Sequence, residues 1–315
     1  MPAQTSTPAL TIFAIPKPFR GHIDVIQRNA IASWTRLDPR PEILLLGDED
    51  GTAAAARDLG VVHQSGGARN EVGTPLLDDF FARGERTAAA PVLAYVNADI
   101  MLTADFLVAI ERVRAAFRKF LMVGRRWDLN LDAPWDFGAA GWQQDLTERA
   151  RCANVLRPPT FIDYFVFTRG FTEGLLPLAI GRGFWDNYLV WRAHSGGAAV
   201  VDATQVVTAV HQNHDYAHNV TGASTGVANT GVVNTWTGSE STRNREMVGG
   251  WWHRYTIEDA THRLTSAGLE HSHLHAWLMV RRLWSHPLTI FTWPWSALRR
   301  APRARHDVRT RTNAE

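Results

Sequence analysis

The sequence predicts an α/β fold, in which a mixed, mainly parallel sheet is flanked by helices, with a helical C-terminal extension. Short apolar runs alternate with segments of helical periodicity over residues 9–102. Strands separated by helices of this length pair in parallel. Polar residues directly follow several of the apolar runs, where strands would end. At 315 residues and 45% hydrophobic content, the chain is long enough to bury a substantial core.

The predicted elements follow the chain in order. Strands are expected at residues 10–15, 42–46, 61–63 and 92–96, separated by helices at 24–37, 53–59 and 74–84. Next come a helix at 105–120 and strands at 120–123, 164–167 and 198–201, with a loop-rich stretch at 125–159. Residues 217–250, rich in Gly, Thr, Ser and Asn, predict a long surface segment. Helices are expected again at 257–267 and 269–284.

Composition excludes several classes of protein. The single cysteine, Cys152, rules out an internal disulfide and a site of several thiolates. Residues 1–10 carry no basic residue, and no stretch reaches the roughly 18 apolar residues of a membrane span, so we expect a cytoplasmic protein. Residues 299–315 carry a net charge of +4 and the other 298 carry −2. No nucleic-acid motif is present, and nucleic acid is not an expected partner.

A polar triplet, Asn97-Ala98-Asp99, interrupts an apolar run after the strand predicted at 92–96. Ligands of open parallel sheets bind at the carboxyl ends of strands, where an Asp can hold a divalent cation through oxygen. The alternative is a turn, in which Asn and Asp are common. Asp48 and Glu49, which end the strand at 42–46, face the same edge and favour the metal site.

The segment Arg69-Asn70-Glu71-Val72-Gly73-Thr74 precedes the helix predicted at 74–84. Arg69 can reach a phosphate, and a helix N-terminus attracts anions. Thr74 followed by Pro75 is a favourable helix start. This segment therefore predicts contact with a phosphate group.

In this order, the motifs resemble those of GT-A type nucleotide-diphospho-sugar glycosyltransferases, with a family-2-like pattern, over roughly residues 9–215. The resemblance implies that Asn97-Ala98-Asp99 is a variant D-x-D motif and that Asp99 ligates Mn²⁺ or Mg²⁺ on the donor diphosphate. It implies that Asn97 lies near the ribose or sugar and Asp48 near the base. The implied nucleotide-sugar site comprises Pro16, Asp48, Glu49, Arg69, Asn70, Thr74, Asn97 and Asp99.

The resemblance also implies an acceptor side. Asp186 stands 87 positions after Asp99 and is expected to deprotonate the acceptor hydroxyl, which favours inversion; the alternative is a helix N-cap. Asp163 either binds a sugar hydroxyl or caps a turn. Trp127 and Trp185 belong to a tryptophan cluster that suits stacking on a saccharide, with core packing as the alternative.

The run His211-Gln212-Asn213-His214 continues to a third histidine, His218, and suggests metal binding. Because side chains alternate along a strand, all three histidines can converge only across a turn. In many GT-A enzymes a late histidine completes the metal shell, so the resemblance makes His211 or His214 the candidate. The alternative is a polar loop with structural hydrogen bonds.

The chain is thus expected to have a nucleotide-sugar-binding half (1–102), an acceptor-binding half (103–216), a loop-rich segment (217–265) and an aromatic and basic extension (266–315). The extension suits contact with anionic lipid, or packs on the domain. The implied enzyme is a hexosyl- or pentosyltransferase acting on a saccharide, lipid-linked or small-molecule acceptor. The rivals are a sugar nucleotidyltransferase, disfavoured by the single glycine in residues 16–21, and a non-catalytic carbohydrate- or nucleotide-binding protein.

Overall fold

The computed structural model describes residues 8–214, 238–250, 253–274 and 277–278. The chain divides into two compact units, Met1–His275 and Ala276–Glu315. All the elements below belong to the first unit. No helix in the described residues is long and apolar enough to cross a bilayer. The aromatic and basic stretch that suits lipid contact lies almost wholly outside the described residues.

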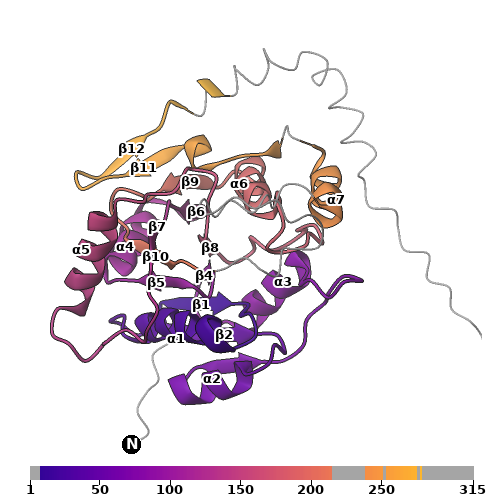
Figure 1. Cartoon of the computed structure of the whole chain (residues 1–315). Coiled ribbons are helices and arrows are strands. Elements are labelled where there is room, and N and C mark those ends of the chain that lie inside the picture. The colour runs from indigo at the N-terminus through magenta and orange to yellow at the C-terminus, as the bar shows by residue number, and fades with distance from the viewer. Residues whose placement is uncertain (1–7, 215–237, 251–252, 275–276, 279–315) are drawn as a thin grey trace, which may run out of the picture. The chain divides into compact units, whose positions relative to one another are not determined.

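Figure 1 shows the order of the elements. The strands are β1 (Leu10–Ala14), β2 (Glu42–Leu46), β3 (Val62–Gln64), β4 (Val92–Val96), β5 (Ile100–Leu102), β6 (Phe120–Val123), β7 (Trp127–Leu129), β8 (Tyr164–Thr168), β9 (Ala199–Asp202), β10 (Ala209–Gln212), β11 (His262–Leu264) and β12 (Leu269–His271). The helices are α1 (Gly21–Thr35), α2 (Thr52–Leu59), α3 (Leu77–Thr87), α4 (Asp105–Ala116), α5 (Trp142–Ala153), α6 (Trp185–Ser195), α7 (Ser239–Val248) and the 3₁₀ helix η3 (Ile257–Asp259).

The large sheet has nine strands in the order β12-β11-β9-β6-β8-β4-β1-β2-β3. Strands β4, β1, β2 and β3 pair in parallel, as do β6, β9 and β11. Strand β8 runs antiparallel to both β4 and β6, and β12 runs antiparallel to β11. The predicted α/β class, with a mainly parallel sheet flanked by helices, is confirmed.

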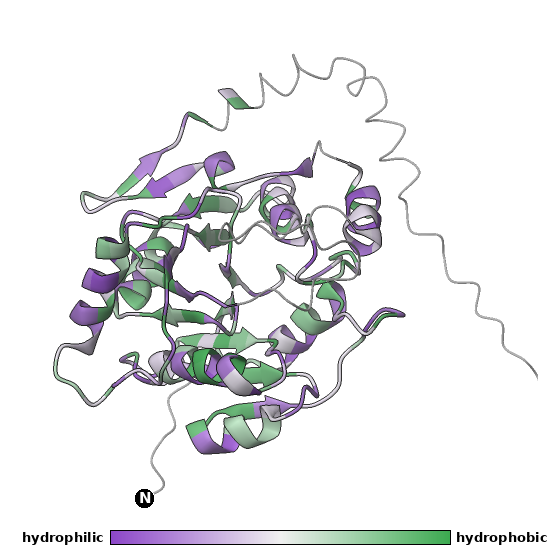
Figure 2. Cartoon of the chain, viewed as in Figure 1, coloured by the Kyte–Doolittle hydropathy of each residue, from purple (hydrophilic) through white to green (hydrophobic). Residues whose placement is uncertain are grey.

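Helices cover both faces of this sheet. On one face, Trp34 of α1 and Phe106 of α4 belong to the main buried cluster, together with residues of α2. On the other face, the ring of Tyr95 lies 4.9 Å from that of Phe81 in α3 and 5.6 Å from that of Trp185 in α6. Figure 2 shows the central strands as mainly hydrophobic, whereas α7 is largely hydrophilic. The buried strands thus form a rigid support for the loops at their ends.

A second sheet of three strands, in the order β5-β10-β7, was not predicted. Strand β10 pairs antiparallel with β5 and parallel with β7. In this register His211 lies opposite Ile100 on one side and Asp128 on the other. Asp99, which directly precedes β5, is therefore brought close to His211 although 112 positions separate them in the chain.

One sequence prediction for the second half is wrong, and another is wrong at its start. The helix expected at 257–267 is replaced by η3 and strand β11, and the helix expected at 269–284 begins instead as strand β12. Leu274, Trp277 and Leu278 are helical, and residues 279–284 lie outside the described residues. Thr265 and Gly268 close this hairpin through mutual backbone hydrogen bonds of 2.8 and 3.3 Å. Pairing of β11 with β9 explains the outcome, because a place at the edge of an existing sheet outweighs a weak helical periodicity.

The segments expected to be loops contain regular structure. The stretch 125–159 includes β7 and α5, and the end of the 217–250 segment forms α7. Residues 217–237 lie outside the described residues. The helix predicted to start at Thr74 starts at Leu77, so Thr74 lies in the loop before α3 rather than in its first turn.

Phe13 tests the account of the core. Its side chain is fully buried among Phe81, Tyr95 and Phe167. Phe13→Ala should lower the free energy of unfolding by about 3–5 kcal/mol, because it leaves a cavity among these rings. Val108→Ala, at a side chain 59% exposed, should change it by less than about 0.5 kcal/mol. Urea unfolding measures both, and a loss below about 1 kcal/mol for Phe13→Ala would contradict this packing.

Candidate active site

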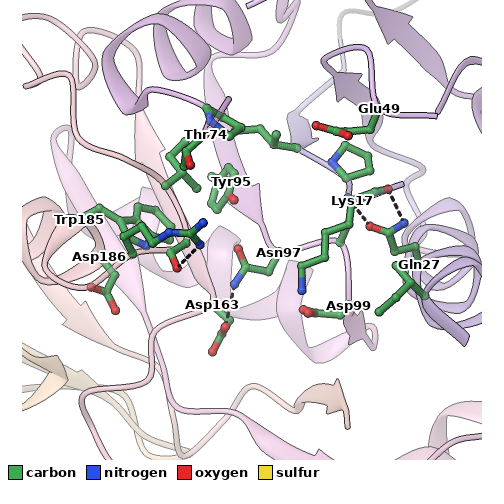
Figure 3. A pocket seen from close by; sticks show the side chains of 18 of the residues that line it. Lys17, Gln27, Glu49, Thr74, Tyr95, Asn97, Asp99, Asp163, Trp185 and Asp186 are labelled. Atoms are coloured by element: carbon green, nitrogen blue, oxygen red, sulfur yellow. Dashed lines mark hydrogen bonds between the residues drawn. The ribbon is translucent and has the colours of Figure 1, made fainter. Parts of the chain in front are cut away.

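A cavity of about 460 Å³ opens at the carboxyl ends of β1 and β4. It is lined mainly by segments 15–18, 72–75, 97–99, 160–163 and 180–183, together with residues of α1 and α6 (Figure 3). This is the sheet edge at which open parallel sheets bind their ligands. Its volume is within the range of small-molecule sites in proteins.

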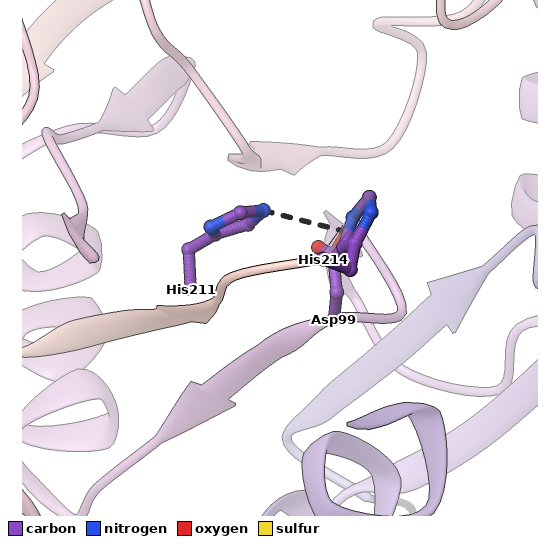
Figure 4. A group of neighbouring side chains, drawn as sticks. All are labelled: Asp99, His211 and His214. Atoms are coloured by element: carbon purple, nitrogen blue, oxygen red, sulfur yellow. Dashed lines mark hydrogen bonds and ion pairs between the residues drawn. The ribbon is translucent and has the colours of Figure 1, made fainter. Parts of the chain in front are cut away.

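Asp99, His211 and His214 form a cluster at this cavity, with one ligand atom from each lying within 4.8 Å of the others (Figure 4). The Nε2 atom of His214 lies 3.1 Å from Oδ2 of Asp99, and Nε2 of His211 lies 3.7 Å from the same oxygen. His211 is on β10, whereas His214 follows that strand, so the end of the strand turns both rings toward Asp99. The structure brings together the three residues that were predicted to bind metal.

The charge on Asp99 is stabilised by its neighbours. Burial alone would raise the pKa of this carboxyl, but His211, His214 and Lys17 outweigh it and hold the pKa well below its ordinary range. Its Oδ1 atom is buried and has no hydrogen-bond partner among the residues that the structure describes. A buried carboxylate oxygen without a partner is costly unless an ion or another donor completes its shell. Asp99 is therefore suited to a cation.

A buried polar network adjoins the cluster. Arg126 donates to Asp163 at 2.6 Å and to Asp128 at 3.1 Å, and Asn97 donates its side-chain amide to Asp163 at 2.7 Å. Nδ1 of His211 lies 3.4 Å from Asp128. Burial raises the pKa of Asp128, but His211 and Arg126 outweigh it and lower the pKa below its ordinary value. The network links the metal-ligand candidates to Asp163 on the acceptor side.

Asp186 lies at the opposite side of the cavity, in the first turn of α6. Its Oδ1 accepts the backbone N–H of Asn187 at 2.8 Å, but the N-cap of α6 is Phe184 and no side chain caps the helix, so the helix-cap alternative is not observed. Burial is the largest influence on its pKa and, with the nearby charge of Asp163, raises it to about 7. Phe184, which directly precedes α6, has a left-handed backbone with φ of 80°, a conformation that costs about 1–3 kcal/mol in a non-glycine residue.

Of the residues predicted to bind the donor, Glu49 and Thr74 lie at the upper side of the cavity in Figure 3. Pro16, Glu49, Arg69 and Thr74 all line the cavity. Arg69 pairs with Glu49 at 2.8 Å and donates to the carbonyl of Gly73 at 2.8 Å. The guanidinium is thereby fixed beside the loop that precedes α3.

Four predicted site residues do not line the cavity: Asp48, Asn70, Trp127 and His214, of which His214 contacts Asp99 as described above. Asp48 instead accepts the backbone N–H of Gly66 at 2.7 Å, and Asn70 accepts that of Thr74 at 2.8 Å. Asp48 and Asn70 thus shape the loops beside the cavity. Trp127 packs against a separate buried cluster formed by residues of β5, β10 and α5 with Leu131, which fits the core-packing alternative.

Four lining or adjoining residues were missed by the sequence reasoning: Lys17, Arg126, Asp128 and Arg182. Asp128 and Arg126 are brought next to the site by the pairing of β7 with β10, which the sequence did not predict. Lys17 could have been singled out because lysine is rare in this sequence, which has two lysines among its 33 lysines and arginines.

No protein-family model matches the chain, and no curated protein matches it. Among solved structures, it is similar to a mannosyltransferase from Pyrobaculum calidifontis in complex with GDP-Man and Mn²⁺, with 14% identity and a TM-score of 0.41 over 68% of this chain and 60% of that one. It is also similar to glucosyl-3-phosphoglycerate synthase from Mycobacterium tuberculosis in complex with Mg²⁺ and UDP, with 14% identity and a TM-score of 0.40 over 67% and 74% of the two chains. This chain therefore spans less than two thirds of the mannosyltransferase. TM-scores below 0.5 carry no argument about function, which has to come from the site itself.

The raised pKa of Asp186 predicts a pH-dependent stability. In the folded protein its pKa is about 7, above its ordinary value of 3.8. Protonated Asp186 therefore contributes to the stability of the fold in full below about pH 4, and this contribution is lost as pH rises through 7. The asparagine of Asp186→Asn is neutral at every pH. The free energy of unfolding of this variant should therefore exceed that of the wild type by up to about 4 kcal/mol at pH 8 and by little at pH 4. Urea unfolding at both pH values measures this.

Asp132→Asn is the matched control, since the side chain of Asp132 is 94% exposed. It should change stability equally little at both pH values. An Asp186→Asn variant that is no more stable than the wild type at pH 8 would show that Asp186 is not held in an unfavourable charged state.

Proposed function

We propose that this protein is a divalent-metal-dependent GT-A type glycosyltransferase, which transfers a sugar from a nucleoside diphosphate sugar to an acceptor hydroxyl. The observation that carries the proposal is the coexistence of two differently tuned carboxylates in one cavity. Asp99 is kept charged beside two histidines, whereas Asp186 has its pKa raised to about 7. Opposite pKa shifts of this kind suit a charge-binding role for one carboxylate and a proton-transfer role for the other.

Asp99, His211 and His214 would hold the metal. The buried Oδ1 of Asp99 has no hydrogen-bond partner in the described part of the chain, and the three ligand atoms approach one another closely, which fits a cation. One oxygen and two imidazole nitrogens suit a transition ion such as Mn²⁺ better than Mg²⁺, which prefers oxygen ligands. When bound, the ion would neutralise negative charge on the diphosphate leaving group.

Asn97, the neutral first member of the triplet, has a different role in this proposal. Its side-chain amide donates to Asp163, which also accepts from Arg126. An Asp at position 97 would place its carboxylate next to that of Asp163, and the two negative charges would repel each other. We therefore assign Asn97 to positioning the acceptor-side carboxylate rather than to binding metal.

The two walls of the cavity would hold the two substrates. On the donor side, Pro16, Glu49, Arg69 and Thr74 would bind the nucleoside diphosphate sugar, on loops shaped by Asp48 and Asn70. On the acceptor side, Trp185 offers an apolar ring to a saccharide beside Asp163 and Asp186. Asp186 would remove the proton of the acceptor hydroxyl, and direct attack by that oxygen would invert the anomeric centre.

Donor binding should depend on metal and nucleotide together. We expect UDP, GDP, ADP or CDP to raise the Tm of the full chain in the presence of Mn²⁺ and to do so much less without it. Asp99→Asn should abolish this joint shift, whereas Asp132→Asn, at an exposed site, should retain it. If the nucleotide shifts are the same with and without Mn²⁺, or if none occurs, the metal-dependent donor site is disproved.

Transfer should require the ionised form of Asp186. Once the Tm panel has identified the nucleotide of the donor, kcat/KM for sugar transfer can be measured against pH. It should rise with pH to a plateau, with an inflection near 7. Asp186→Asn should lower it about 10²–10⁴-fold and remove the inflection, while leaving the joint Tm shift by Mn²⁺ and nucleotide in place. Binding without measurable transfer by the wild-type protein would instead support a non-catalytic binding protein.

A further inference from the structure

Lys17 is a basic residue that lies beside the candidate metal ligands. It follows β1 and lines the cavity, and Figure 3 shows its ammonium pointing toward the carboxylate of Asp99. We propose that Lys17 binds the diphosphate of the donor and thereby makes metal binding and diphosphate binding depend on each other. This inference rests on the proposed function, because it assumes a diphosphate ligand.

The backbone of Lys17 is held firmly. Its N–H donates to the side-chain carbonyl of Gln27 at 2.7 Å, and its own carbonyl accepts from the amide of Gln27 at 2.9 Å. Gln27, in α1, is only 2% exposed. Pro16 and Pro18 on either side restrict the backbone further. A long, flexible side chain thus starts from a fixed point at the mouth of the site.

The other cations of the cavity wall are already neutralised by protein carboxylates. Arg69 pairs with Glu49 at 2.8 Å, Arg126 with Asp163 at 2.6 Å, and Arg182 with Glu240 at 2.6 Å. In contrast, within the described part of the chain, the ammonium of Lys17 has no carboxylate at ion-pair distance. Its charge is therefore available to an anionic ligand, whereas each arginine would first have to give up a partner.

The position of Lys17 also affects a cation at Asp99. Burial lowers the pKa of Lys17, and the nearby carboxylate of Asp99 opposes this shift, so the ammonium and the carboxylate attract each other. A divalent ion bound to Asp99 would lie near the ammonium and be repelled by it. A diphosphate between the two cations converts this repulsion into two attractions. Each ligand should therefore bind weakly alone and strongly with the other, and such coupling is reciprocal.

Titration of Mn²⁺ followed by electron paramagnetic resonance of the free ion tests the coupling in the full chain. Without nucleotide, Lys17→Met should bind Mn²⁺ on the order of ten-fold more tightly than the wild type. With the nucleoside diphosphate of the Tm panel, the wild type should gain Mn²⁺ affinity and Lys17→Met should gain little. Lys17→Arg, which keeps the charge, should retain most of the gain, and Lys119→Met should behave as the wild type.

The chain provides an internal control for a second test, because Lys17 and Lys119 are its only lysines. Lys119 lies on the surface and donates to the carbonyl of Gly196 at 2.7 Å. Acetylation followed by mass spectrometry should show Lys17 protected by Mn²⁺ and nucleoside diphosphate together, with Lys119 unchanged. This readout uses the wild-type protein and is independent of whether a variant folds.

The outcomes separate the two proposals. If the wild type binds Mn²⁺ and nucleotide cooperatively but Lys17→Met does so equally, or if Lys17 is acetylated at the same rate with both ligands present, the role of Lys17 is disproved and the proposed function stands. If none of UDP, GDP, ADP and CDP binds with Mn²⁺, both proposals fail.

Discussion

Strand β10 is held between β5 and β7, and the register of this pairing places His211 next to both Asp99 and Asp128. The candidate metal cluster depends on that constraint. A shift by one residue would turn His211 to the other face of the small sheet and remove it from Asp99. His214 reaches the same carboxylate only because β10 ends where it does. The main sheet supports this arrangement, since β4 leads directly into the triplet that contains Asp99.

Electrostatics divide the cavity into two regions of different character. Around Asp99, histidines and Lys17 favour the charged carboxylate, and Asp128 and Asp163 are charged partners of Arg126. Asp186 lies where burial dominates, so its carboxyl is neutral over much of the acidic range. The first region suits a metal and a diphosphate, whereas the second suits proton transfer at neutral pH. Under the proposed function, one cavity would provide both functions that sugar transfer from a diphosphate requires.

Much of the first half of the fold could be predicted from sequence, because each strand and helix there carries its own periodicity. Asp99, His211 and His214 could be recognised by residue type and order. Asp128 and Arg126 could not, since their role arises from strand pairing between distant segments. Lys17 was passed over because only the fold shows that the arginines of the cavity pair with carboxylates, whereas Lys17 has no carboxylate at ion-pair distance in the described ranges. The hairpin after η3 was missed because contact with β9, rather than local propensity, determines it.

The central claim is that Asp99, His211 and His214 bind the metal that holds the donor diphosphate. The most direct test is a crystal structure of the protein grown with Mn²⁺ and its nucleoside diphosphate, using the anomalous scattering of manganese to locate the ion. The account predicts an anomalous peak coordinated by Asp99, His211 and His214 and in contact with the diphosphate. A peak elsewhere in the cavity, or a bound diphosphate without manganese at these three residues, would contradict it.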